Sequence, residues 1–142
     1  MKNLTWWYRV TGAVYLILGL SWLPPLTAAT LTQKIPDFDG PAGGVAARGF
    51  GDWMLMFSLD LLVLGVFLLI GSRRPIAWLP LLWLTLALGL VRGIADDVYM
   101  IARGYPPLPF IGFIALHAAI IVWGLLAWRG VRRRQGAPLS AR

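Results

Sequence analysis

Three ionisable side chains lie inside long apolar stretches of this sequence. Asp60 stands in MFSLDLLVLG, Arg92 in LGLVRGIADD and His117 in FIALHAAII. An ionised side chain at the centre of a lipid bilayer costs about 2.5–3.5 kcal/mol on insertion scales. We therefore expect these side chains to turn away from lipid and to meet at one place inside a helical bundle.

Helical spacing adds further polar residues to this cluster. Arg48 and Asp52 are four residues apart, and Asp52 is close enough to Asp60 in helical rotation for both to face one interior. In RGIADDVYMIARGY, residues 92–105, several polar side chains share one helix face. The candidate ligand-binding residues are Arg48, Asp52, Asp60, Arg92, Asp96, Tyr99 and His117.

Two interpretations of these residues stay open. In the structural one, Asp60 forms an interhelical lock with Arg92, or a protonated Asp60 bonds His117, and residues 92–103 form local pairs on a wet helix end. Asp97 and Arg103 fit that wet end. In the functional one, Asp60 and His117 form the floor of a polar pocket that opens outward.

An enzymatic role for the same residues is a further alternative. His117 and Asp60 are candidates for an acid–base pair in a proton transfer such as double-bond isomerisation, which needs a base that reaches the substrate proton. No motif names a reaction, so the sequence leaves open whether the protein is an enzyme.

Composition excludes several classes of protein. With 58% hydrophobic and 13% charged residues, against about 25% charged in soluble domains, the chain is suited to a bilayer. The chain has no cysteine and one histidine, which rules out disulfides, thiolate sites and multi-histidine metal sites. Nothing in the spacing of the aspartates requires an oxygen-rich metal site, so we predict neither metal nor cofactor. The net charge of +7 does not predict nucleic-acid binding, because the basic residues flank apolar runs.

The apolar runs predict the fold. Each is near the roughly 20 residues that a helix needs to cross the hydrocarbon core, and unpaired backbone groups in lipid force helices. We predict an all-α membrane protein, an antiparallel up-down bundle of four transmembrane helices, at about residues 4–22, 50–70, 75–96 and 109–128.

The basic residues predict the orientation. Most of them lie at the amino terminus, in the turn near residues 71–75 and in the carboxyl-terminal tail, whereas all six aspartates fall on the other side. The positive-inside rule then places both termini in the cytoplasm. Residues 24–47 become a periplasmic loop, and the tail 129–142 a cytoplasmic anchor against anionic lipid heads. Cleavage of the first run as a signal peptide is the competing interpretation.

Small and aromatic residues predict how the helices meet. Gly89 and Gly93 in GLVRG form a small-xxx-small pair that permits close approach of two helices. Gly12, Gly19 and Gly65 can do the same for the first two helices. Most tryptophans, with Trp6, Trp7 and Tyr8 at the start, fall where an interfacial belt is expected.

Four stretches of the sequence resemble the BphX-like family. They are WWYRVTGAVYLILG, RGFGDW with Asp60 after it, RGIADDVYMIARGY and FIGFIALH. The resemblance covers about residues 5–128. The family consists of small four-helix bacterial membrane proteins, encoded in some cases beside genes of aromatic-ring dioxygenases. It implies an inner-membrane location and a link to aromatic-compound metabolism, and it supplies no established activity.

These observations favour a membrane module that binds or helps pass a small hydrophobic compound, aromatic or quinone-like, with Asp60, Arg92 and His117 orienting it. The expected partners are the lipid bilayer and that small molecule. A membrane enzyme using His117 and Asp60 is one alternative. An accessory subunit of a larger membrane complex, or a homo-oligomer, is another.

Overall fold

The computed structural model describes residues 2–31, 35, 38–41 and 43–135, and for residues 134 and 135 it describes the backbone alone. Over these residues the chain is helical and contains no strand. The elements in order are α1 (Lys2–Ser21), α2 (Pro24–Ala29), α4 (Val45–Gly71), α5 (Leu79–Leu90), the π-helical segment η1 (Val91–Ala95), α6 (Asp96–Ala102) and α7 (Pro107–Gln135).

Prolines and one glycine set the helix ends. α1 ends before Pro24, and α5 begins at Leu79 with Pro80 in its first turn, where the missing N–H is not needed. The third apolar helix therefore begins at Leu79 rather than at Pro75, and residues 75–78 form a turn. Gly104, with φ +93°, follows α6 in the left-handed region that favours glycine.

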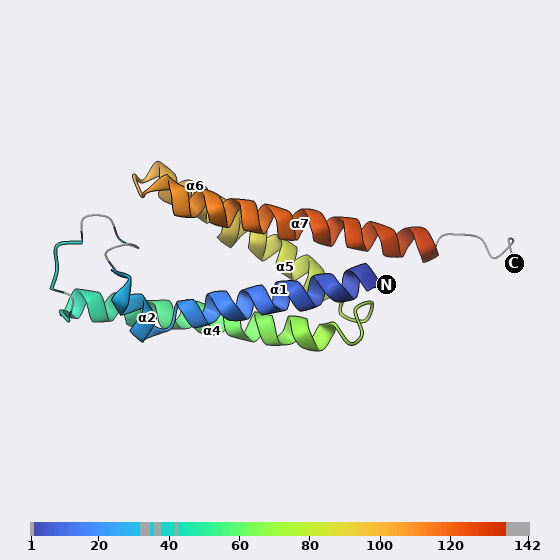
Figure 1. Cartoon of the computed structure of the whole chain (residues 1–142), viewed down its shortest axis with the longest axis horizontal. Coiled ribbons are helices and arrows are strands. Elements are labelled where there is room, and N and C mark those ends of the chain that lie inside the picture. The colour runs from blue at the N-terminus through green and yellow to red at the C-terminus, as the bar shows by residue number, and fades with distance from the viewer. Residues whose placement is uncertain (1, 32–34, 36–37, 42, 136–142) are drawn as a thin grey trace, which may run out of the picture.

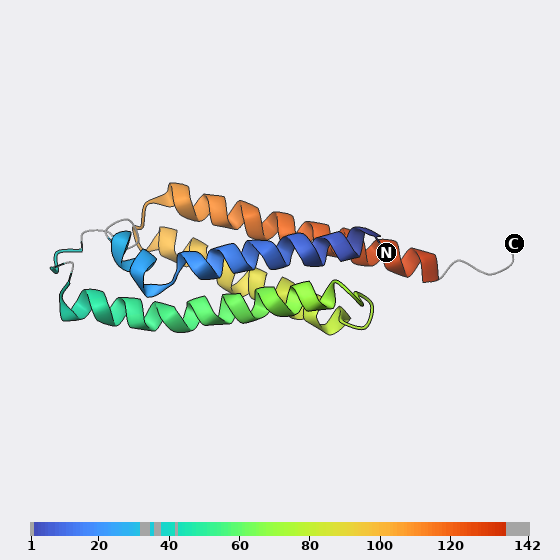
Figure 2. The same cartoon turned by 60° about the horizontal axis from the view of Figure 1, so that its bottom comes forward.

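The long helices lie lengthwise beside one another (Figures 1 and 2). α1 packs along α4, α7 contacts both α1 and α5, and α4 makes few contacts with α5. The start of α1, the end of α7 and the turn between α4 and α5 lie at one end of the molecule, whereas α2 and the turn between α6 and α7 lie at the other (Figure 1). We call these the terminal end and the α2 end.

Small residues let α1 and α4 approach closely, as the sequence predicted. A Cβ on Gly12 would lie 3.0 Å from the backbone oxygen of Gly65, and a Cβ on Gly65 would lie 2.9 Å from that of Gly12. Ser58 is fully buried nearby and donates a hydrogen bond from its hydroxyl to the Gly19 carbonyl at 2.7 Å. The contact therefore leaves no room for larger side chains at either glycine.

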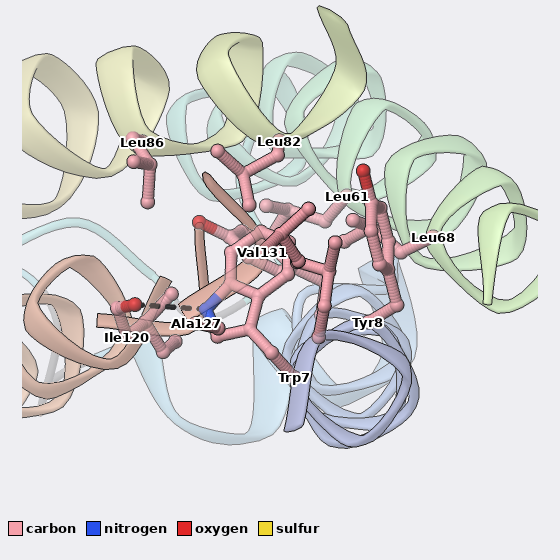
Figure 3. Packing of buried hydrophobic residues seen from close by; sticks show 11 residues of the cluster. Trp7, Tyr8, Leu61, Leu68, Leu82, Leu86, Ile120, Ala127 and Val131 are labelled. Atoms are coloured by element: carbon pink, nitrogen blue, oxygen red, sulfur yellow. Dashed lines mark hydrogen bonds between the residues drawn. The ribbon is translucent and has the colours of Figure 1, made fainter. Parts of the chain in front are cut away.

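Figure 3 shows the packing of the hydrophobic core, whose members Leu4, Trp7, Leu68 and Val131 come from the parts of α1, α4 and α7 near the terminal end. Trp7 is fully buried and donates from its indole nitrogen to the Ile120 carbonyl at 2.9 Å. Tyr8 is also fully buried and donates to the Trp78 carbonyl at 2.6 Å. Both residues were expected in an interfacial belt, but only Trp6 of that group is exposed. The difference arises because one helix face points inward, which the run of three aromatic residues does not reveal.

Three helical segments are long and apolar enough to cross a membrane, as in a membrane protein: Val45–Gly71, Leu79–Ala102 and Pro107–Arg133. α1 is not among them, since Lys2, Arg9 and its aromatic residues lower its hydropathy. Val45, Ala102 and Arg133 lie five or six residues beyond the predicted bounds, because the helices extend past the apolar runs, whereas Leu79 lies four residues inside the predicted start at 75.

Candidate functional site

A pocket of about 550 Å³ lies between α4 and α5, which make few contacts with each other. α4 and α5 supply its two sides, while Tyr15 of α1 and His117 of α7 line it from the other two long helices. Most of its lining is apolar, with aromatic rings from Tyr15, Trp22, Phe57, Phe67 and Phe113. Four ionisable side chains also reach it: Asp60, Arg92, Asp97 and His117.

Asp60 and Arg92 form an ion pair across the pocket. The distance between Arg92 Nη1 and Asp60 Oδ2 is 3.2 Å. The Arg92 guanidinium also lies over the Phe57 ring, 5.2 Å from its centroid. The interhelical contact proposed from the sequence is therefore present. The side chain of Asp60 is nevertheless 62% exposed and that of Arg92 45% exposed. The pair therefore lies at the open side of the pocket and not in the bundle interior.

His117 lies at the deep side of the pocket and is 8% exposed. Its Nδ1 contacts the Phe113 carbonyl oxygen at 2.9 Å. Since a carbonyl oxygen can only accept, Nδ1 donates in this contact, and the neutral ring then carries an unprotonated Nε2. The Tyr15 ring approaches the imidazole edge to face, with 6.1 Å between centroids.

Gly93 makes room for the imidazole. A Cβ at this position would overlap the His117 ring. The sequence predicted close helix approach at Gly89 and Gly93, and the structure places α7 against both residues. What fills the space at Gly93 is a histidine side chain rather than a second backbone.

The π-helical segment η1 directly precedes the two neighbouring aspartates Asp96 and Asp97. The Asp96 amide donates to the Val91 carbonyl, a step of five residues instead of four. Such a wide turn changes the register of the side chains that follow it. Asp97 lines the pocket, whereas Asp96 is exposed. Arg92 pairs with Asp60 of α4, and not with a neighbour in residues 92–103 as the structural interpretation expected.

Asp97 is the most unusual group in this site. Its side chain lines the pocket, the residue is 8% exposed, and Oδ2 has no hydrogen-bond partner. Most buried polar atoms in proteins have a partner, so an unpaired one calls for an explanation.

The structure places the remaining candidates away from the pocket. Arg48 is exposed and donates to the Gly43 carbonyl at 2.7 Å. Asp52, Asp96 and Tyr99 are also exposed and do not line the pocket. Of the seven residues proposed from the sequence, Asp60, Arg92 and His117 come together.

Among the pocket residues that carry a hydroxyl or a carboxylate, Tyr15 and Asp97 were missing from that set. Nothing in the sequence of α1 distinguishes Tyr15 from other aromatic residues. Asp97 had a usable signal, because Gly89, Gly93 and Asp97 recur every four residues. The face that predicted close helix contact therefore also contained the buried carboxylate.

Asp60 and His117 do not bond each other. Asp60 is paired with Arg92, and His117 with the Phe113 carbonyl. The two line one pocket, so a joint role through a bound molecule stays a prediction, but a direct acid–base contact is not formed. Within the described part of the chain, no three His, Asp or Glu side chains are grouped so as to hold a metal ion.

Comparison with known proteins gives one match. A family model described as BphX-like matches residues 1–133. No curated protein and no solved structure matches the chain.

Proposed function

The chain belongs to the BphX-like family, and from that premise we propose that it is a four-helix inner-membrane protein that binds a small hydrophobic compound in the pocket between α4 and α5. The observation that carries the proposal is the convergence of four ionisable side chains on one apolar pocket of about 550 Å³. Small-molecule sites typically measure about 300–1,000 Å³ and combine apolar walls with few polar groups.

In this proposal α1 is the fourth membrane helix and both termini are cytoplasmic. Support comes from its contacts along α4 and from the position of the start of α1 and the end of α7 at the same end of the molecule (Figure 2). The basic residues Arg73, Arg74, Arg132 and Arg133 belong to segments at that end. The positive-inside rule assigns such an end to the cytoplasm.

The pocket would then open sideways into the bilayer. Leu59, Val63 and Leu84 line it and are exposed, so its rim is apolar. An ion pair left bare among acyl chains is costly. A ligand with a polar group would cover Asp60 and Arg92, while its apolar body replaces lipid against the leucines. A compound dissolved in the membrane can reach such a site without passing through water.

The walls favour a ring-shaped compound. Aromatic pairs gain about 0.5–1.5 kcal/mol beyond burial when they stack with an offset or meet edge to face. The aromatic lining offers several such contacts. We therefore propose an aromatic or quinone-like ligand, in keeping with a role in aromatic-compound metabolism.

Filling the pocket tests the proposal. Purified protein in lipid nanodiscs is titrated with a tritiated hydrophobic naphthalene probe. Leu84→Trp places a bulky ring on the pocket wall and should abolish saturable binding. Leu90→Trp makes the same change at an exposed position outside the pocket and should leave binding intact. Equal binding by both variants would contradict a ligand site between α4 and α5.

A second set of variants tests the polar groups. Asp60→Ala and His117→Ala should each weaken binding of a probe that carries a polar substituent, because its orienting partners are lost. Asp52→Ala removes a carboxylate from α4 outside the pocket and is the matched control. Unchanged affinity in all three variants would show that the polar groups do not orient a ligand and that the pocket is a groove filled by lipid.

A further inference from the structure

We propose that Asp97 accepts a hydrogen bond from the ligand, and that the ligand is therefore a neutral ring compound with a hydroxyl donor, such as a phenol or naphthol. This inference rests on the proposed function and narrows the class of compound. It follows from an atom that the fold leaves without a partner.

The first step is the state of the carboxylate. Asp97 Oδ2 is buried without a hydrogen bond, although Asp97 lines a pocket with room for a small molecule. A buried polar atom without a partner costs about 1–3 kcal/mol. The next residue in the chain, Asp96, is exposed and carries no such cost. Burial of Asp97 is therefore a cost that a bound donor group would remove.

The second step is the backbone that leads to Asp97. The π turn of η1 ends two residues before Asp97, which lines the pocket. Turns of this kind are rare and occur frequently at functional sites. Because the turn and the unpaired oxygen are separate observations, the inference does not rest on either alone.

The third step is the charge of the ligand. An ammonium group would also satisfy a carboxylate, but Arg92 lines the same pocket and is a fixed positive charge. Its guanidinium already lies over the Phe57 ring, a position that a cationic ligand would otherwise take. A neutral hydroxyl meets no such repulsion. The ion pair of Asp60 and Arg92 remains free to bind a second polar substituent.

The experiment compares two probes that differ by one donor. Affinities of 2-naphthol and 2-methoxynaphthalene are measured for the full chain in nanodiscs. The naphthol should bind about tenfold more tightly, because a hydrogen bond to a charged group is worth about 1.5–3 kcal/mol. In Asp97→Leu the preference for the naphthol should disappear, so that the two affinities become equal. Saturable binding of the methyl ether by this variant shows that the pocket is still formed.

Two further variants separate the donor contact from a general effect. Asp96→Leu makes the same change one residue away, at an exposed position, and should keep the tenfold preference. Asp97→Asn retains a neutral acceptor and should give an intermediate preference.

The outcomes are distinguishable. Equal affinities for the two probes in the native protein would overturn the role of Asp97 while leaving the proposed binding function standing. Tighter binding of 1-naphthylmethylammonium than of 2-naphthol would replace the neutral ligand with a cationic one. If neither naphthalene probe binds the native protein more tightly than it binds the Leu84→Trp variant, both the inference and the proposed function fail.

Discussion

The terminal end of the bundle and the region around Asp97 are built in opposite ways. At the terminal end, large side chains such as Trp7 and Tyr8 fill the space between helices, and both of their polar atoms are hydrogen-bonded (Figure 3). Between α4 and α5 the helices stand apart, and a carboxylate oxygen is buried without a partner. The contrast suggests that one region supplies stability, whereas the other gives up stability for a binding site.

Trp7→Ala tests the first half of this comparison and should have the largest effect. Truncating a buried tryptophan costs about 3–5 kcal/mol because it removes contacts and leaves a cavity. We expect a large fall in the free energy of unfolding, measured by denaturant titration in mild detergent. Trp6→Ala, at the exposed neighbour, should change it little. Similar effects of the two substitutions would mean that Trp7 does not lie in the core.

Gly93→Ala tests how tightly the pocket wall is fitted. The added methyl group overlaps the His117 ring, and such overpacking costs about 1–3 kcal/mol. We expect lower stability together with loss of probe binding, because the ring must move. The control is Gly112→Ala on α7, where a Cβ has no neighbour within 4 Å and the gain in helix propensity should be seen instead.

Asp97→Leu should stabilise the protein, in contrast to the two preceding substitutions. Replacing an unpaired buried carboxylate with an apolar group removes its desolvation cost, so the free energy of unfolding should rise by about 1–3 kcal/mol. Thermal unfolding followed by circular dichroism in the same detergent would detect this. Asp96→Leu should produce no comparable rise. A destabilised Asp97→Leu protein would instead give the carboxylate a structural role.

Tyr8→Phe removes one hydrogen bond from the terminal end and keeps the ring. The Trp78 carbonyl loses its side-chain donor, so a loss of about 1 kcal/mol is expected. Probe binding should be unaffected, because Tyr8 does not line the pocket. A change in affinity would show that the two regions are coupled.

The ion pair should contribute least to stability. Interhelical hydrogen bonds in one membrane protein average about 0.6 kcal/mol. A double-mutant cycle with Asp60→Asn and Arg92→Gln should therefore give a coupling energy near that value, since both side chains are largely exposed. A coupling of several kcal/mol would make the pair a structural lock.

The composition and the apolar runs were sufficient to predict helices, membrane-crossing segments and the meeting of Asp60, Arg92 and His117. Such features depend on the hydropathy of each residue and on the free-energy cost of placing a charge in lipid. Both are properties of the individual side chain and can be read from the sequence. The end of the first helix before Pro24 was also close to its predicted bound, whereas the start of the third was placed at Pro75 and lies at Leu79.

Tertiary structure alone decided which side of each helix faces inward and where the helices separate. The burial of Trp7 and Tyr8, the gap between α4 and α5 and the exposure of the ion pair depend on contacts between distant segments. The pairing of Arg92 with Asp60 and the space that His117 fills at Gly93 likewise depend on neighbours from other helices. Such contacts are set by how the helices pack against one another, because the period of a single helix does not say which neighbour its faces will meet.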